Sequence, residues 1–359
     1  MNSKPKSIQD VQELTRQTVC LLPRGGGTKP ALTHPKEGIE ILDMSGVAGI
    51  LEYEPGEFTF TALAGTSVAE VERILAGQDQ FLPFDPLLVE GGATLGGTVA
   101  ANISGPGRYH YGGVRDFLMG VRFVDSQGQV VHGGGKVVKN AAGFDLPKLM
   151  VGSLGGLGVL VELAFKVFPR PEKYATLRIE CDHLEQALQV MQQAGSARLE
   201  MDALDLQPLP AGYVVWMRLG GLAGALTARL ERLKDAVGEC QVVQGTDEAQ
   251  LWRDVREVAW VPDGWSLVKV PLTPGRIPRL EADLAGKPVL RRYVSGGQLA
   301  WLALEEAPQT LDGLLSAQGL SGLVLLGPPG RPRLGVSDRG SFYRRIKTAL
   351  DPLGRFAEV

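Results

Sequence analysis

The spacing of hydrophobic residues predicts a strand followed by a helix early in the chain. Residues 54–63 alternate, with Phe58 and Phe60 on one face and threonines on the other, which predicts an extended strand. Residues 68–76 carry valine and leucine at helical spacing, and Ser67 is placed to cap the first turn. This part of the chain therefore combines both element types.

Similar patterns continue to the end of the chain. Residues 120–125 and 129–132 alternate around a polar Ser-Gln-Gly sequence, which predicts a β-hairpin, and residues 159–168 predict a long strand after a glycine turn. Beyond Pro171, the order of elements predicts an antiparallel sheet with helices on one side. Strands are expected there at 174–181, 213–219, 266–271, 289–294, 298–304 and 322–326, and helices at 184–194, 222–237, 248–258, 275–285 and 309–318.

Two prolines mark a boundary between two halves of different composition. Pro169 and Pro171 interrupt the chain after the predicted long strand, and the residues that follow are more charged. We therefore expect an α+β protein with one domain up to residue 170 and a second domain from residue 171 to residue 336.

Glycine is the unusual component of the sequence. Of the 359 residues, 47 are glycine, about twice the usual share, and 18 of them lie between Gly91 and Gly158. Glycine adopts backbone conformations that other residues avoid, and it lets a ligand approach the backbone closely. The rest of the composition, with 44% hydrophobic and 21% charged residues, is that of an ordinary globular protein.

Charge and targeting signals narrow the function classes. A formal net charge of −3 gives no electrostatic footprint for a nucleic acid, so none is expected as a partner. The N-terminal residues are polar, and no run reaches the ~20 apolar residues of a membrane span. Cys20, Cys181 and Cys240 are widely spaced and are expected as reduced thiols. A cytoplasmic location is the expectation.

Common cofactor and catalytic motifs are absent from the sequence, but two glycine-rich runs remain. There is no Gly-x-Gly-x-x-Gly fingerprint, no P-loop and no Gly-x-Ser-x-Gly turn, and the four histidines are isolated, so no metal site is expected. In Arg24-Gly25-Gly26-Gly27-Thr28, successive N–H groups can point at one anion such as pyrophosphate. In residues 91–102, mostly small side chains would let a flat ligand lie on the backbone.

Together with two later motifs, these runs resemble the FAD-linked oxidases of the vanillyl-alcohol oxidase type. The later motifs are residues 139–146 leading into 152–159, and the closing residues 351–356. The four motifs occur in the family's order. The resemblance implies an α+β fold: a PCMH-type FAD-binding domain of two subdomains divided near residue 60, then an α+β cap domain with an antiparallel sheet. Residues 337–359 would return to the FAD-binding domain.

Within this family, the chain is most similar to the second flavin subunit of glycolate oxidase complexes. The similarity rests on residues 42–46, on Gly65-Thr66, on residues 82–86 and on residues 105–108. It implies a redox subunit that oxidises a 2-hydroxy acid such as glycolate, or relays its electrons. The implied partners are a catalytic FAD subunit and an iron–sulfur subunit, and any membrane association would pass through these partners.

The resemblance also implies which residues contact FAD. The first run would hold the pyrophosphate, the second would lie along the ribityl chain and the isoalloxazine ring, and the turn before the long strand would meet the adenine. The implied cofactor-binding residues are Arg24, Gly25, Gly26, Gly27, Thr28, Gly91, Thr94, Gly96, Gly97, Ser104, Gly105, Tyr111, Gly112, Gly158 and Val159.

Three departures from the family pattern refine these expectations. Covalent flavin attachment uses a histidine in the family, whereas Thr28 and Lys29 follow the glycines here, so non-covalent FAD is favoured. Leu154 stands where the family has an acidic residue. Members that oxidise 2-hydroxy acids carry a pair of histidines in the cap, but His183 is alone between residues 171 and 336, so no catalytic base is evident.

Several polar side chains allow two interpretations. Residues 108–111 (Arg-Tyr-His-Tyr) either face the flavin or bind a carboxylate, or they pack as a loop between domains. Lys136 and Lys139 lie near the flavin or are solvated. Residues 291–293 are expected at an exposed strand edge, and Trp301 is expected in the core.

Two alternatives to a redox subunit stay open. A stand-alone FAD-dependent alcohol oxidase would carry an acid–base residue in the cap domain. A flavin-free scaffold subunit would have no reason to keep the glycine runs, because glycine is costly to order.

Overall fold

The computed structural model describes all residues except 1, 34–36, 136–143, 329–330, 337–339 and 359. Contacts divide the chain into two compact units, one formed by residues 1–104, 113–170 and 338–359, and one formed by residues 105–112 and 171–337. The short segment 105–112 thus belongs to the second unit, although it lies in the glycine-rich half of the sequence.

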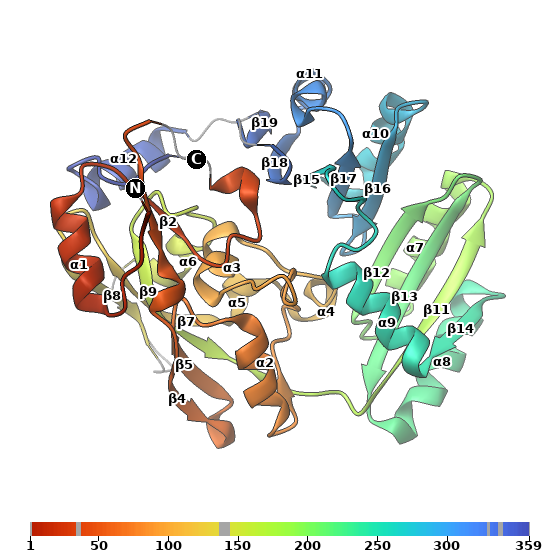
Figure 1. Cartoon of the computed structure of the whole chain (residues 1–359). Helices are drawn as coiled ribbons and strands as arrows, with labels where there is room; N and C mark the ends of the chain where they lie inside the picture. The colour runs from red at the N-terminus through yellow and green to blue at the C-terminus, as the bar shows by residue number, and fades with distance from the viewer. Residues whose placement is uncertain (1, 34–36, 136–143, 329–330, 337–339, 359) are drawn as a thin grey trace. The chain divides into compact units, whose positions relative to one another are not determined.

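Among the described residues, the first unit contains a parallel three-stranded sheet and an antiparallel five-stranded sheet (Figure 1). In the small sheet, β3 (Glu40–Asp43) lies between β1 (Asn2–Ser3) and β2 (Leu21–Arg24). The larger sheet has the order β4 (Ile50–Glu54), β5 (Thr59–Leu63), β9 (Val159–Lys166), β7 (Leu118–Val124) and β8 (Val130–Gly134), and β6 (Gln80–Phe81) pairs with β10 (Phe168–Pro169). The helices are α1 (Ile8–Gln17), α2 (Val68–Ala76), α3 (Leu95–Ala101), α5 (Val114–Phe117), α6 (Leu146–Met150) and α12 (Gly340–Leu350).

One hydrophobic core joins the two sheets of the first unit. Val11 of α1, Leu42 of β3, Val161 of β9 and Phe356 near the end of the sequence belong to it, and each is at most 2% exposed. These side chains come from four separate parts of the chain, so burial of their apolar surface holds the small sheet against the large one.

The C-terminal segment lies beside strand β2. The amide of Leu21 donates to the carbonyl of Arg355 at 2.6 Å, and the amide of Ala357 donates to the carbonyl of Leu21 at 2.8 Å. The Lys347 amine of α12 donates to the carbonyl of Phe356 at 2.7 Å. The strand that leads into the first glycine run is therefore held by residues from the far end of the sequence.

The early elements agree with the sequence patterns at two places and differ at one. Helix α2 begins after Ser67, whose hydroxyl accepts a backbone hydrogen bond, and β7 and β8 form the predicted hairpin. The prediction of one strand over residues 54–63 is wrong in part. A 3₁₀ turn over Pro55–Glu57 and a left-handed Phe58 (φ 53°) turn the chain, so β4 and β5 pair antiparallel.

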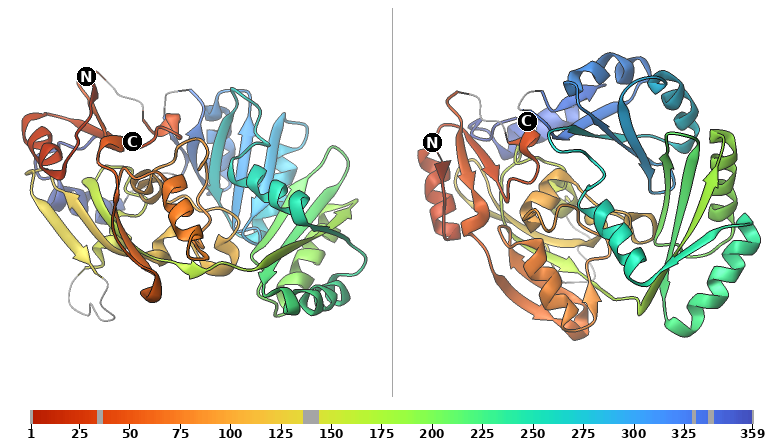
Figure 2. Two further views of the ribbon diagram at one scale, coloured as in Figure 1. Left: turned by 60° about the horizontal axis from the view of Figure 1, so that its bottom comes forward. Right: turned by 45° about the vertical axis from the view of Figure 1, so that its right-hand side comes forward.

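In the described part of the chain, the second unit is built on a nine-stranded antiparallel sheet (Figure 2). Its order is β14 (Gln241–Gln244), β11 (Lys173–Cys181), β13 (Tyr213–Gly221), β12 (Ala203–Pro208), β16 (Val289–Val294), β17 (Leu299–Leu304), β15 (Ser266–Pro271), β18 (Ser321–Leu326) and β19 (Arg333–Gly335). The helices are α4 (Arg108–Tyr111), α7 (Leu184–Ser196), α8 (Ala223–Val237), α9 (Gly245–Arg256), α10 (Ile277–Leu284) and α11 (Asp312–Ala317).

The two faces of this sheet are covered differently. Helices α7, α8 and α10 lie on one face, and α9 lies on the other (Figure 2). Trp252 of α9 packs against Ala203 of β12 and is 1% exposed. The expectation that all helices lie on one side is therefore wrong for α9, because the buried tryptophan in its apolar stripe fixes it to the opposite face.

Every element predicted beyond Pro171 is present, with ends shifted by a few residues. The sequence patterns missed β12, β14 and β19. Strand β12 places Asp205 in a buried position, and the charge interrupts the apolar alternation that identifies a strand. Strands β14 and β19 are short strands at the two edges of the sheet.

Two further observations concern sequence-based expectations. All three cysteines are free, with Cys181 buried and Cys20 and Cys240 half-buried. Of the helices in the described ranges, none has the length and apolar character to cross a membrane.

Candidate cofactor-binding site

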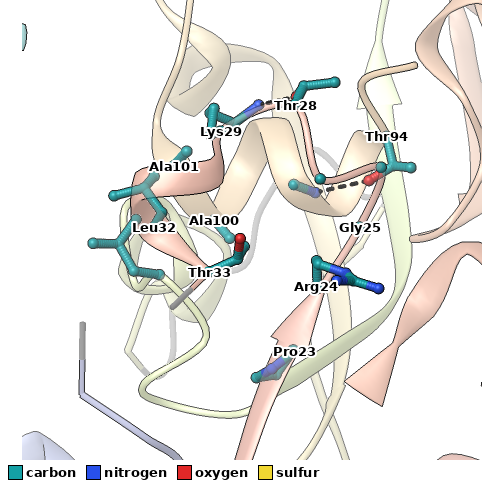
Figure 3. A pocket seen from close by; sticks show the side chains of 14 residues that line it. Pro23, Arg24, Gly25, Thr28, Lys29, Leu32, Thr33, Thr94, Ala100 and Ala101 are labelled. Carbon is teal, nitrogen blue, oxygen red and sulfur yellow. Dashed lines mark hydrogen bonds between the residues drawn. The ribbon is translucent and has the colours of Figure 1, made fainter. Parts of the chain in front are cut away.

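The two glycine runs meet backbone to backbone in the first unit (Figure 3). A Cβ added at Gly25 would lie 2.1 Å from the Thr94 hydroxyl oxygen, and one added at Gly26 would lie 1.8 Å from the carbonyl oxygen of Gly92. Real atoms do not approach so closely, so a side chain at either position would push the runs apart. Glycine at positions 25 and 26 therefore lets the first run pack directly against the second run.

The first run leaves backbone donors available to a ligand. The amides of Gly25, Gly26 and Gly27 donate no hydrogen bond to any other described residue. Gly27 has a left-handed backbone (φ 70°), a conformation that favours glycine. Consecutive free N–H groups of this kind form an anion-binding concavity.

Two adjoining hollows lie along the meeting line of the runs. Both are shallow and open to solvent, with cavity volumes of about 60 and 40 Å³. Pro23, Arg24, Gly25, Thr94, Gly97 and Ala100 line both of them. Because the two hollows share these residues, they form one continuous groove along the glycine runs.

Helix α3 forms one wall of this space. The Thr94 hydroxyl accepts a hydrogen bond from the Gly97 amide at 3.2 Å and so caps the helix. A Cβ at Gly96 would lie 2.9 Å from the carbonyl oxygen of Ala64, so Gly96 lets the helix start lie against the end of β5. The capped start of α3 is thereby fixed beside the first run.

The ionisable side chains of the lining are both cationic. Arg24 lies 3.7 Å from the Asp43 carboxylate, which also accepts hydrogen bonds from Ser45. Lys29 is 7% exposed, and burial lowers its pKa to about 8. No carboxylate lines either hollow in the described part of the chain, so the space favours an anion.

A third segment closes the far side of the space. Leu154 and Gly155 have left-handed backbones (φ 52° and 77°), and Gly158 has a φ of 152°. Leu154 lines one hollow, and Gly155 and Gly158 line the other. A Cβ at Gly158 would lie 2.6 Å from the Phe123 ring, so glycine lets β9 start directly beside its neighbour β7 in the sheet.

Most of the predicted cofactor residues come together here. Gly91 lies beside Thr28, because a Cβ on Gly91 would lie 3.6 Å from the Thr28 methyl group. The predicted residues that line the hollows are Arg24, Gly25, Gly26, Gly27, Thr28, Thr94, Gly96, Gly97 and Gly158.

The other predicted residues have different surroundings. The Ser104 hydroxyl accepts a hydrogen bond from the Val114 amide at 3.0 Å, and the Val159 side chain lies in the hydrophobic core. Gly105, Tyr111 and Gly112 belong to the second unit. Lys136, Lys139 and most of the 139–146 motif lie outside the described residues.

The second unit contains a polar cluster that the sequence patterns did not identify. Arg292 of β16 is 3% exposed, and its Nε donates to Asp205 Oδ2 at 3.0 Å. The guanidinium also lies 5.7 Å from the Trp252 ring. The expectation that residues 291–293 form an exposed strand edge is wrong, because β16 lies between β12 and β17 in the sheet.

A lysine extends the charged face toward the next strands. Lys269 of β15 pairs with Trp301 of β17, which pairs with Arg292, so all three side chains share one face. Lys269 is 8% exposed, and burial together with the charge of Arg108 lowers its pKa to about 8. Trp301 is 5% exposed, as expected for a core residue.

Helix α4 adds a tyrosine and a histidine to the second unit. The Tyr111 hydroxyl bonds to Asp202, and burial raises the pKa of both groups. His110 lies edge-on to the Tyr111 ring, with centroids 4.3 Å apart. These contacts place Tyr111 against Asp202 within the second unit, and both interpretations of residues 108–111 stay open.

The residues of the first unit fit FAD. The free amides of the first run, two cationic side chains and a glycine-lined wall suit a pyrophosphate joined to flat ring systems. Lys29 and Thr33 are the polar lining residues that the prediction did not include. The position of Lys29, two residues after the last glycine of the first run, is the sequence feature that could have indicated it.

Comparisons with known proteins agree with this fit. A family model described as "FAD binding domain" matches residues 3–134. Glycolate oxidase subunit GlcE of Escherichia coli is 32% identical over 97% of this chain and 94% of its own length. Glycolate oxidase subunit GlcD of Bacillus subtilis is 29% identical over 59% of this chain and 46% of its own length.

A solved structure shows the same fold. An alkyldihydroxyacetonephosphate synthase matches with a TM-score of 0.75 at 17% identity, over 98% of this chain and 74% of that protein. The predicted α+β PCMH-type fold and the predicted FAD cofactor are confirmed. The chain belongs to the same family as GlcE and is a FAD-dependent oxidoreductase of the vanillyl-alcohol oxidase type.

Proposed function

We propose that this protein is the FAD-binding redox subunit of a glycolate oxidase-type complex. It would oxidise a 2-hydroxy acid such as glycolate to the 2-oxo acid, or relay the electrons of that reaction. The observation that carries the proposal is the similarity to GlcE over 97% of the chain, because it covers both units. The similarity to GlcD covers only 59% of the chain and supports a related but different subunit.

The first unit would hold FAD without a covalent bond. The amides of Gly25, Gly26 and Gly27 would donate to the pyrophosphate, and the wall formed by Thr94, Gly96 and Gly97 would lie along the rest of the cofactor. No histidine or cysteine lines the hollows in the described residues, which supports non-covalent binding. Bound FAD supplies the hydride acceptor, and the chain supplies position and electrostatics.

The second unit carries charges that suit an acidic substrate. Arg108 and Lys269 are close enough for the arginine to lower the lysine pKa, and Arg292 has an Nη2 with no hydrogen-bond acceptor among the described residues. A carboxylate bound near these cations would be favoured by charge and by bidentate hydrogen bonds to arginine. This arrangement supports a 2-hydroxy acid as the substrate class.

The missing cap histidines support dependence on partner subunits. His183 stands at the start of α7, and it is the single histidine of residues 171–336. Proton removal from a hydroxy acid needs a positioned base with a pKa near the working pH. We therefore assign this step to a catalytic FAD subunit, with an iron–sulfur subunit as the electron acceptor of the complex.

Absorption spectroscopy of the purified chain tests the proposal. After heat denaturation and centrifugation, flavin bands should appear in the supernatant, and glycolate should bleach them only when the partner subunits are present. Rapid bleaching of the isolated chain would instead identify a stand-alone oxidase. A colourless protein that does not bind added FAD would identify a scaffold subunit.

A further inference from the structure

Lys29 is a buried amine beside the first glycine run. Its side chain is 7% exposed, and its Nζ donates to the Thr28 hydroxyl oxygen at 2.9 Å (Figure 3). In the described part of the chain, Thr28 is its one hydrogen-bond partner, and no carboxylate lies within ion-pair distance. The amine is therefore placed in the binding space with a neutral partner.

An ammonium group without a counter-ion is costly to bury. Burial lowers the pKa of Lys29 to about 8, so the protonated form predominates near pH 7 but is less stable than that of a lysine in water. The Thr28 hydroxyl satisfies one N–H but does not balance the charge. A negatively charged ligand in the same hollow would balance it.

Among the described residues that line this hollow, none supplies a negative charge. Arg24 is the second ionisable side chain of the hollow, and it is already 3.7 Å from Asp43. The remaining described lining residues come from the first glycine run and its flanks, from α3 with its cap, and from the loop before β9. All of them are neutral: Pro23, Gly25, Gly26, Gly27, Thr28, Leu32, Thr33, Thr94, Gly97, Ala100, Ala101 and Leu154. Every charged side chain among the described lining residues is therefore a cation.

We propose that Lys29 is a positioning residue for the pyrophosphate of FAD, whose ammonium supplies the positive charge that the free amides of residues 25–27 lack. The inference rests on the proposed use of this hollow for FAD. It also defines a selectivity: Lys29 favours flavins that carry phosphate. Riboflavin has no phosphate and gains nothing from the ammonium.

Binding of FAD then depends on pH in a defined direction. The phosphate charges raise the lysine pKa above its value of about 8 in the free protein. Above that pH, binding requires uptake of a proton, so FAD affinity is full below pH 8 and falls as the pH rises. The stability of the FAD-free protein changes in the opposite direction, because a depressed lysine pKa stabilises the fold as pH rises from about 8 toward 10.5.

The test compares Lys29→Gln with a matched lysine variant. Lys148→Gln is the control, because Lys148 is on α6 of the same unit, lies outside both hollows and pairs with Asp145 at 2.7 Å on the surface. FAD-free protein is titrated with FAD and with riboflavin at about pH 7 and about pH 9, followed by flavin fluorescence. Calorimetry in buffers of different ionisation enthalpy measures the proton uptake.

Lys29→Gln should weaken FAD binding by about 10- to 100-fold at the lower pH, as expected for loss of a charged hydrogen bond. Its affinity for riboflavin should stay unchanged, and both the pH dependence and the proton uptake should disappear. Lys148→Gln should behave as the wild type in every titration.

Three outcomes would overturn the inference. The first is equal FAD affinity of Lys29→Gln and the wild type. The second is an equal loss of riboflavin binding, which would indicate a general change of the hollow. The third is a lower urea midpoint of the FAD-free variant near pH 7, because removal of a functional buried charge should leave stability equal or higher. Failure of the wild type itself to bind FAD would contradict the proposed function instead.

Discussion

The two units prepare their binding surfaces by different means. The first unit exposes backbone: three consecutive amides remain free, and side chains are absent where two loops touch. The second unit buries charged side chains on one face of a sheet, where Asp205 and Arg292 pair at 3.0 Å. A backbone surface needs a short continuous run of glycine, whereas a side-chain surface can be assembled from distant strands.

This difference explains which parts of the site could be predicted. Residues 24–28 and 91–97 are contiguous motifs, so the sequence indicated the anion site and the family resemblance supplied its cofactor. Asp205 and Arg292 are 87 positions apart, and no local pattern links them. The consecutive arginines 291 and 292 point to opposite faces of the sheet, Arg291 toward Glu281 and Arg292 toward Asp205. Their burial depends on the order of the strands, which no local pattern shows, so the prediction of an exposed edge failed.

The largest expected effect comes from breaking the buried pair of the second unit. Arg292→Met leaves Asp205, which is fully buried, without its counter-charge, and should lower the free energy of unfolding by about 3–5 kcal/mol. All five tryptophans lie between residues 216 and 301, so tryptophan fluorescence during urea unfolding reports on this unit. The double variant with Asp205→Leu removes both charges and should recover most of the loss; an unchanged midpoint of the single variant would contradict the assignment.

The next effect tests the backbone surface of the first unit. Gly26→Ala places a methyl group 1.8 Å from the Gly92 carbonyl oxygen, so the loops must separate. We expect about 1–3 kcal/mol of destabilisation and at least tenfold weaker FAD binding, measured by thermal unfolding and by flavin fluorescence. Gly56→Ala is the control, because open space surrounds that glycine. Wild-type FAD affinity in Gly26→Ala would show that the contact between the runs is not needed.

A smaller effect concerns the cap of α3. Thr94→Ala removes the acceptor of the Gly97 amide and should destabilise the first unit by about 1 kcal/mol. Thr94→Ser keeps the hydroxyl and should retain most of the stability. Circular dichroism during thermal unfolding of the FAD-free protein distinguishes the two. Equal losses in both variants would assign the effect to the methyl group.

The smallest effect is a pH dependence in the second unit. Burial raises the pKa of Asp202, so the folded protein favours its protonated form and loses stability as pH rises through that pKa. Asp202→Asn does not titrate and can still accept from Tyr111. The free energy of unfolding of this variant should equal that of the wild type near pH 3. Near neutral pH it should exceed the wild-type value by less than about 1 kcal/mol, measured by urea unfolding. A less stable variant at neutral pH would show that the Asp202 charge is needed.

The position of the C-terminal segment has a consequence for biosynthesis. The strand that carries the first glycine run is hydrogen-bonded to Arg355 and Ala357, and the first unit is discontinuous in sequence. During translation the residues of β2 leave the ribosome first, but their partners Arg355 and Ala357 follow about 330 positions later in the chain. The nascent chain therefore cannot form all the backbone hydrogen bonds of β2 before residue 357 has been synthesised, so the strand that leads into the first glycine run is completed late.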